Sequence, residues 1–423
     1  MVAFRALTAV AAALALTTTP HFARPTTPLR EAVPAWADEI AAGDFNGDGL
    51  ADVVVTRLGA VPTDTFPVTI LLNKGNGRFV DATKSIFVGA VPLTQHPRQI
   101  VVADLNGDGR SDIFIADHGS DVLPFPGYPN TLILSAPGRK LIDASANLPR
   151  TPDFSHTATA GDVDGNGTID LYVGNLSSGC TGCAAVPPEL LLNDGTGHFR
   201  IADGALPPEV AAPFSLHYNG SALVDVNGDG ALDLVLAAAS NAYYPPSRSL
   251  VLLNDGHGHF SIASQLPPKP FGPMANSLGI SFGDLNGDGK PDLVLASAPS
   301  DASLTGAWLQ VLINNGDGTF RDETNTRLPG QHDNSDHWIA FPQLIDLNGD
   351  GKLDLLTHFD GSSGISPAFL NDGAGVFVPL HVPALQQGLF AFVNDKPRTN
   401  ARDVLALSDT GGVETYRFYR RVK

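Results

Sequence analysis

The stretch "DLNGDGKPDLVLA" runs from Asp284 to Ala296, and five near-copies of it stand elsewhere in the chain. These copies begin at Asp44, Asp104, Asp162, Asp225 and Asp346. Successive copies start 60, 58, 63, 59 and 62 residues apart. A period of this length, without helical periodicity inside the units, indicates a repeat architecture built of strands.

Each unit repeats the same order of features. A short apolar run leads into the acidic motif, and the last Asp of the motif opens a second run, such as "DLVLAS" from Asp292. A third run ends in a glycine-rich turn such as "NDGHGHF" at Asn254, and the Phe of this turn starts a fourth. Asn-Asp-Gly supplies the positive φ angles of a tight hairpin. Four antiparallel strands per unit, repeated around a ring, predict a β-propeller.

A seventh unit is disguised in "FVNDKPRTNARDVLALSD". Asp395 and Asp403 stand eight apart, as Asp284 and Asp292 do, but the other oxygen ligands and the glycines are missing. The chain ends before a fourth strand of this unit. We therefore predict an all-β, seven-bladed propeller in which residues near 22–30 complete the last blade, so that the N-terminal strand closes the ring and no sheet edge stays open.

The six complete motifs match D-x-[DN]-x-[DN]-G-x-x-D. With their regular spacing they resemble the FG-GAP/VCBS repeat propellers, a family that includes the head of integrin α-chains and some secreted lectins. The resemblance covers residues 22–423, which we expect to form a single domain. It implies a propeller with calcium loops, but this family hosts several functions, so the function has to be argued from the site.

The motif has the spacing of an oxygen cage. Positions 1, 3 and 5 can point side-chain oxygens inward, the Gly at position 6 permits the sharp turn, position 7 lends its carbonyl, and the Asp at position 9 closes the shell. Position 12 is hydrophobic instead of the Glu of an EF-hand, so the loop should pass into a strand. Oxygen ligands favour Ca²⁺, and we expect six structural ions. The predicted ligands are Asp44, Asn46, Asp48, Leu50, Asp52, Asp104, Asn106, Asp108, Arg110, Asp112, Asp162, Asp164, Asn166, Thr168, Asp170, Asp225, Asn227, Asp229, Ala231, Asp233, Asp284, Asn286, Asp288, Lys290, Asp292, Asp346, Asn348, Asp350, Lys352 and Asp354.

The net charge of −18 has the same origin, because each of the six motifs carries three Asp. The acidity therefore indicates a demand for metal, and it argues against nucleic acid as a partner.

Residues 1–19 have the pattern of a secretory signal peptide: Arg5 precedes an apolar run that is too short to span a bilayer. The alternative is a buried first helix. No other stretch approaches transmembrane length, so we expect a secreted protein, extracellular or periplasmic, with no membrane insertion. We also expect it to be a monomer. Free Ca²⁺ is abundant outside cells, which agrees with the loops.

Cys180 and Cys183 are the two cysteines, in "CTGC" within a Gly/Ser-rich loop. In an oxidising compartment a disulfide between them is expected. A redox-active pair is the alternative.

The predicted strand order places the acidic motifs and the glycine-rich hairpins on one face. Long loops lie on the opposite face, and such loops on a rigid scaffold often carry binding residues. His side chains there could bind metal, act as acid and base, or contact a sugar; alternatively, each satisfies a loop carbonyl. The candidate ligand-binding residues are Trp36, His96, His118, His156, His217, Tyr243, Tyr244, Trp308, His337, Trp338 and His358.

These observations favour a secreted, calcium-binding binding module that takes a glycan or an extracellular protein on the face opposite the calcium loops. The alternative is a polysaccharide-acting enzyme, a lyase or hydrolase, that uses a His/Tyr/Arg cluster at the channel mouth. A third possibility is an adhesion module. The sequence has no nucleophile elbow, P-loop or dinucleotide fingerprint, so no catalytic residue is assigned.

Overall fold

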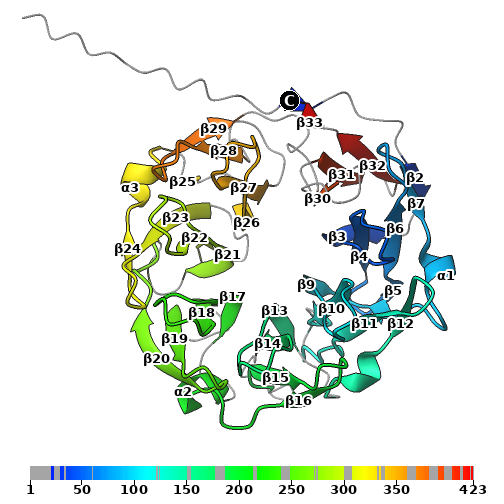
Figure 1. Cartoon of the computed structure of the whole chain (residues 1–423), viewed down its shortest axis with the longest axis horizontal. Coiled ribbons are helices and arrows are strands. Elements are labelled where there is room, and N and C mark those ends of the chain that lie inside the picture. Colours follow the sequence, from blue (N-terminus) through cyan, green and yellow to red (C-terminus); the bar gives the residue numbers. More distant parts are fainter. Residues whose placement is uncertain are drawn as a thin grey trace, which may run out of the picture.

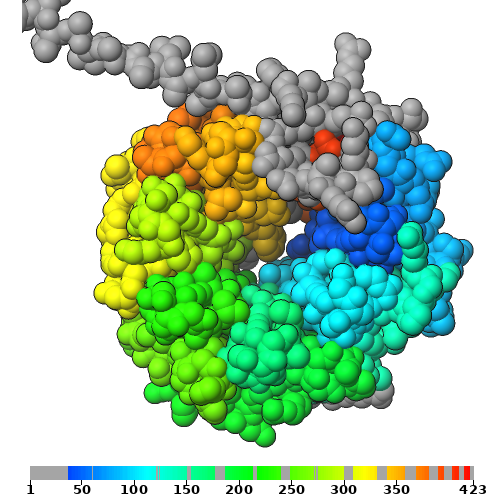
Figure 2. All heavy atoms as spheres, viewed as in Figure 1, coloured from blue at the N-terminus to red at the C-terminus, as the bar shows by residue number. Residues whose placement is uncertain are grey.

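The computed structural model describes residues 21–422, apart from 23–28, 33–34, 60, 121, 123, 150–153, 177–185, 213–216, 240–247, 271, 273–274, 300–306, 331–332, 335–338, 360–367, 381–388, 395–402, 410–412 and 420. Seven antiparallel sheets stand in a ring (Figure 1). Figure 2 shows that the ring is hollow at its centre. The predicted seven-bladed propeller is confirmed, and we number its blades in chain order.

Each blade is built from four strands, which follow one another along the chain in blades 1–6. The first strands line the centre; they are β3 (Ala35–Gly43), β9 (Pro97–Ala103), β13 (Ser155–Gly161), β17 (Tyr218–Val224), β21 (Asn276–Gly283), β26 (Ile339–Ile345) and β30 (Leu389–Val393). The second strands are β4 (Asp52–Gly59), β10 (Asp112–Asp117), β14 (Asp170–Asn175), β18 (Asp233–Ala238), β22 (Asp292–Ala298), β27 (Asp354–Phe359) and β31 (Asp403–Asp409).

The third and fourth strands lie towards the rim. The third strands are β6 (Thr69–Asn73), β11 (Thr131–Ala136), β15 (Glu189–Asn193), β19 (Leu250–Asn254), β23 (Ala307–Asn314), β28 (Ala368–Asn371) and β32 (Val413–Tyr419). The fourth strands are β7 (Phe79–Asp81), β12 (Lys140–Asp143), β16 (Phe199–Ile201), β20 (Phe260–Gln265), β24 (Phe320–Asp322), β29 (Phe377–Leu380) and, in the last blade, β2 (Leu29–Ala32).

The remaining elements are short. Strand β5 (Phe66–Pro67) pairs with β8 (Leu93–Thr94), and β25 (Asp333–Asn334) adds to β23. Three single-turn helices and one 3-10 turn follow fourth strands: α1 (Thr83–Ile86), α2 (Pro208–Ala211), α3 (Thr324–Arg327) and η1 (Ser145–Asn147). No helix in the described part of the chain is long and apolar enough to cross a membrane.

Every second strand begins on the last Asp of its motif, including β31, which begins on Asp403 of the disguised seventh unit. Strands β10, β14 and β18 are buried at every position, as expected for aliphatic runs covered on both faces. Their side chains meet those of the next blade. One apolar cluster joins Phe114 of blade 2 to Leu171 of blade 3, and another joins Val53 of blade 1 to Leu405 of blade 7.

The N-terminal strand closes the ring. Strand β2 pairs antiparallel with β32, with Leu29 opposite Tyr416, and β1 (His21–Phe22) pairs with β33 (Arg421–Val422). The predicted closure is thus confirmed, with the closing strand at the end of the expected segment and two residues beyond it. A buried ion pair also spans the seam, since Nε and Nη2 of Arg57 each donate to Glu414 at 2.8 Å.

Removing β2 should destabilise the propeller, because β32 would become an unpaired edge and blade 7 would have three strands. A chain that begins at Val33 should melt at a lower temperature and aggregate more than a chain that begins at His21. Thermal melts and light scattering measure this. Equal melting temperatures for the two chains would contradict the assigned closure.

Candidate functional site

The aspartate at position 9 of each motif is fully buried, and both of its oxygens accept backbone hydrogen bonds. In blade 3, Oδ2 of Asp170 accepts from the N–H of Val163 (3.1 Å) and Oδ1 from the N–H of Asn193 (2.8 Å). The same two bonds recur at Asp52, Asp112, Asp233, Asp292 and Asp354. This carboxylate therefore ties each nine-residue motif, here called an acidic loop, to the end of the third strand.

Burial raises the pKa of these carboxyls. Burial, together with the charge of acidic neighbours in the loop, raises the pKa to about 7 for Asp52 and to about 6 for Asp170 and Asp354. A cation beside such a group favours its charged form. The buried aspartates thus fit a loop that holds a divalent cation.

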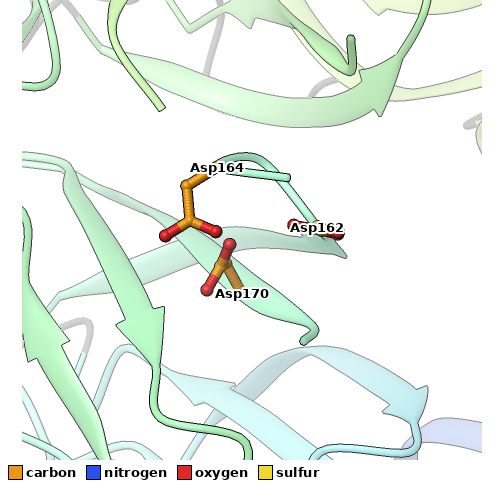
Figure 3. A group of neighbouring side chains, drawn as sticks. All are labelled: Asp162, Asp164 and Asp170. Carbon is orange, nitrogen blue, oxygen red and sulfur yellow. The ribbon is translucent and has the colours of Figure 1, made fainter. Parts of the chain in front are cut away.

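The rest of each acidic loop curls around the first Asp. The N–H of the Gly at position 6 donates to Oδ2 of that Asp in all six loops, at 2.7–3.1 Å. These glycines have φ between 79° and 90°, a region that side chains disfavour. In the third loop Asp162, Asp164 and Asp170 converge, with one carboxylate oxygen from each within 4.8 Å of the others (Figure 3). A donor set of carboxylate, amide and carbonyl oxygens fits Ca²⁺.

The hairpin asparagines bind the blades to one another. In blade 3, Nδ2 of Asn193 donates to the carbonyl of Leu105 in the acidic loop of blade 2 (2.8 Å) and to Ile169 in its own blade (2.9 Å). Asn254, Asn314 and Asn371 make the equivalent pair of bonds, and Asn73 donates to the carbonyls of Asn394 and Ala51. The sequence analysis assigned these residues to a turn alone and missed this role.

On the opposite face, the first strands of blades 1–6 carry a register shift against their second strands. The residues left unpaired are Asp38, Arg98, His156 and Asn219 in blades 1–4, and 278–279 and 341–342 in blades 5 and 6. Strand β30 of blade 7 pairs without a shift. The shifts occur at equivalent positions of the six first strands, so the six bulges lie at one level of the channel. A bulge changes the direction of the side chain it carries.

A cavity of about 320 Å³ lies at this level and is lined by first strands of all seven blades. Its two halves differ in chemistry. Blades 1–4 contribute most of the polar residues, which are Glu39, Arg98, Gln99, Thr157, Asn219 and Ser221, together with the apolar Ile40, Ala41, Ala42 and Ile100. Blades 5–7 contribute mainly apolar residues, which are Ile280, Phe341, Pro342, Phe390 and Phe392, together with the polar Gln343.

Hydrogen bonds between blades hold the polar half in place. Oε1 of Gln99 accepts from Oγ1 and from the backbone N–H of the next blade, at Thr157 and Ala158 (both 3.0 Å). The Thr157 hydroxyl lies 2.8 Å from Oγ of Ser221 in blade 4. Gln99, Thr157 and Ser221 thus form a fixed polar wall across blades 2–4.

Arg98 and Glu39 are the charged groups of the cavity lining. Nη1 of Arg98 lies 3.4 Å from Nε2 of His96, and the guanidinium has no ion-pair partner within the described part of the chain. Burial raises the pKa of Glu39 well above its ordinary value, the charge of Asp38 adds to this, and Arg98 opposes it. Glu39 is therefore held towards its neutral form.

Three of the predicted histidines meet beside Arg98. The ring of His118 lies 4.0 Å from that of His96 and is stacked on that of His156 at 4.7 Å, with Phe154 packed against both His118 and His156. Burial, followed by Arg98 and the other imidazoles, lowers the pKa of His156 well below its ordinary value. Nε2 of His156 is buried and has no hydrogen-bond partner among the residues described.

The ring of His118 packs between the other two imidazoles, stacked on His156 with 12° between the ring planes and tilted by 45° against His96. Within the described ranges, Asp162, Asp164 and Asp170 form the one group of three such side chains with all ligand atoms within 4.8 Å. The histidine ring contacts therefore favour a packed wall over a preformed metal site.

The other candidates are placed as follows. His217 is buried and close enough to affect the pKa of His156, whereas Trp308 lies on the third strand of blade 5, opposite Ser297. Trp36 lies on β3 and His358 lies on β27, and for these two residues only the backbone is described. Tyr243, Tyr244, His337, Trp338, Cys180, Cys183 and the expected signal peptide at 1–19 lie outside the described residues.

The sequence analysis missed Glu39, Arg98 and Asn219. A signal for them exists, because Arg98 and Asn219 each stand six residues before the first Asp of a motif, and Glu39 stands five before.

A family model for the FG-GAP-like repeat matches residues 44–115, 162–236, 225–295 and 295–357, which together make up more than half of the chain. The chain belongs to the FG-GAP-like repeat family. The acidic loops of all six blades 1–6 lie within the matched segments.

Curated relatives of this FG-GAP repeat protein include cartilage acidic protein 1 of Mus musculus and of Xenopus tropicalis. The identity is 27% over 184 and 185 residues respectively, which is 43% of this chain and 26% of each relative. The matched part thus spans about a quarter of the relatives' length. Among solved structures, the N-terminal domain of Nup159 aligns over 95% of both chains with 9% identity and a TM-score of 0.45.

Replacing a hairpin asparagine should weaken the contact between blades of this FG-GAP repeat protein. Asn314→Ala leaves the buried carbonyls of Val226 and Pro291 without their donor, which should lower the free energy of unfolding by about 2 kcal/mol or more. Denaturant titration measures the loss. The neighbouring exposed Asn315→Ala is the matched control and should change stability by less than about 0.5 kcal/mol. Equal effects of the two substitutions would refute the bridging role.

Proposed function

We propose that this FG-GAP repeat protein is an extracellular, calcium-stabilised binding module that holds a glycan or protein ligand at the face opposite its acidic loops. The observation that carries this proposal is the set of six bulges at the channel, of which those of blades 2, 4, 5 and 6 place different residues in the wall of one cavity. Bulges of this kind are frequent next to functional sites. The propeller fold itself suggests a binding module.

The acidic loops support the calcium part of this proposal. Six loops with the same buried Asp and the same curled backbone are what a structural ion needs, and a repeated ion site serves the scaffold rather than one ligand. The ion supplies positive charge that offsets the burial of the position 9 carboxylates. The bound state should therefore be more stable than the ion-free state.

Three arguments support an extracellular location. The relatives in mouse and frog are named for cartilage, and weak calcium sites fill readily where free Ca²⁺ is abundant. The pattern of residues 1–19 is that of a secretory signal peptide.

Removal of calcium should destabilise the propeller. EDTA should lower Tm and added Ca²⁺ should restore it, because each ion contributes on the order of 1–3 kcal/mol at tens to a hundred times its Kd. Elemental analysis should find six ions in the native protein. Asp164→Ala should remove one of them, whereas Asp194→Ala, an exposed acid on the hairpin of the same blade, should remove none. A native protein with no calcium and a melt unchanged by EDTA would contradict this part.

A ligand should bind through the cavity. The calcium-loaded protein should retain a glycan on an array or a protein from extracellular matrix extract. Thr157→Val keeps the volume but breaks the bonds to Gln99 and Ser221, so it should weaken binding severalfold. Thr196→Val, on an exposed hairpin of the acidic face, should not. If the Thr157→Val variant retained the ligand as well as the native protein does, the ligand would not bind in the cavity. Capture of no ligand by the native protein would count against the binding function.

A polysaccharide lyase or hydrolase is the second candidate. The observation that favours it is an imidazole with an open Nε2, His156, whose pKa is affected by nearby Arg98. A neutral imidazole can act as a general base, and a guanidinium can neutralise a carboxylate. If this candidate is correct, a polyuronide panel should show cleavage that disappears in His156→Gln while Tm and calcium content stay unchanged. Absence of cleavage by the native protein would rule out this candidate and favour the binding module.

A further inference from the structure

Arg98 lines the cavity and forms no ion pair with any residue that the structure describes. It stands on a bulge of β9, so its side chain is directed away from the regular ladder. Nη1 of Arg98 donates to Nε2 of His96 at 3.4 Å. The carboxyl of Glu39 lines the same cavity and interacts with the charge of Arg98, but it makes no ion pair with the guanidinium among the described contacts. A guanidinium in this setting can bind an anion through two parallel hydrogen bonds.

Neutral hydrogen-bonding groups stand on the same wall. Oδ1 of Asn219 is buried and has no donor among the residues that the structure describes. Thr157 and Ser221 are held in place by their mutual bond. Such fixed polar groups fit the hydroxyls of a ligand, because a buried polar atom without a partner costs free energy until a ligand satisfies it.

The facing wall is mainly apolar and partly aromatic, with Gln343 as its polar residue. Phe341 and Pro342 form the bulge of blade 6, and Phe390 and Phe392 lie on β30 with their rings 5.8 Å apart. A sugar ring has an apolar face of C–H groups that packs on aromatic side chains, and hydroxyls at its edge that need polar partners. The two halves of the cavity match these two sides.

The volume limits the ligand. About 320 Å³ lies at the lower end of the range of roughly 300–1,000 Å³ found for ligand sites. One sugar unit with its substituents fits such a space, whereas a longer chain would have to continue out of the channel.

We propose that this cavity binds a carboxylate-bearing sugar unit, with the carboxylate on Arg98 and the apolar face of the ring against blades 5–7. The inference rests on the proposed binding function and names its ligand class. Glu39 also lines the cavity, and its carboxyl group can hydrogen-bond with a hydroxyl of the ligand.

Three small probes separate the two parts of this proposal. D-glucuronate carries both features, D-glucose the ring alone and acetate the carboxylate alone. Titration calorimetry on the calcium-loaded full chain should give at least tenfold tighter binding for glucuronate than for either partial probe.

Substitutions then test each wall. Arg98→Gln should remove the preference for glucuronate over glucose, and Phe341→Leu should reduce the preference for glucuronate over acetate. Arg200→Gln, which removes an exposed arginine from the rim strand β16, is the matched control and should leave all three affinities unchanged. The Tm of each variant, measured in the presence of calcium, should equal that of the native protein.

The outcomes are distinct from those for the proposed function. Glucose binding as tightly as glucuronate, or glucuronate affinity that survives Arg98→Gln, would overturn the inference and leave a neutral-glycan or protein module intact. Absence of glucuronate binding in a protein that captures a partner from extract would do the same. Loss of glucuronate binding in Arg98→Gln alone, with the control unchanged, supports it.

Discussion

A buried carboxylate at the start of each second strand is the constraint on which the ring is built. One of its oxygens holds the acidic loop and the other holds the end of the third strand, as at Asp170. The same burial penalises the charge of that carboxylate. The fold therefore contains, in each of six blades, a group that organises the backbone and also gains from a nearby cation. The acidic loops are alike because each of these blades has to offset the burial of the same carboxylate.

The first strands connect this uniform face to a varied one. At one end they run into acidic loops that repeat almost residue for residue, and at the other end they carry bulges whose residues differ between blades. Repetition suits a scaffold, because every copy does the same work. Binding one ligand requires different groups at different points of a ring, and the alternation of Arg98, Asn219 and Phe341 around the cavity provides them. The cavity lining and the acidic loops can thus vary independently along the first strands of blades 1–6.

Local sequence was sufficient for the blades and insufficient for the cavity. The motif spacing predicted where second strands begin, even at Asp403, because the turn chemistry is contained in nine consecutive residues. The closing strand was also predicted, from the missing fourth strand of the last unit. The bulges were not, since a register shift depends on how two strands pair and not on either strand alone. For the same reason His96, His118 and His156 were expected on one face but their stacking was not. The inter-blade bonds of Asn193 and its equivalents join residues about 88 positions apart, beyond any local pattern.

The pairing of β2 with β32 has a consequence for the order of folding. Strand β2 is synthesised before every strand of blades 1–6, yet its partner β32 follows all of them. Blades 1–6 each contain all of their own strands and can assemble as the chain lengthens. Blade 7 cannot, so β2 stays without its partner until the other six blades have been synthesised. The ring is closed in one late event that joins β2 to β32, and until then the growing propeller is an open arc.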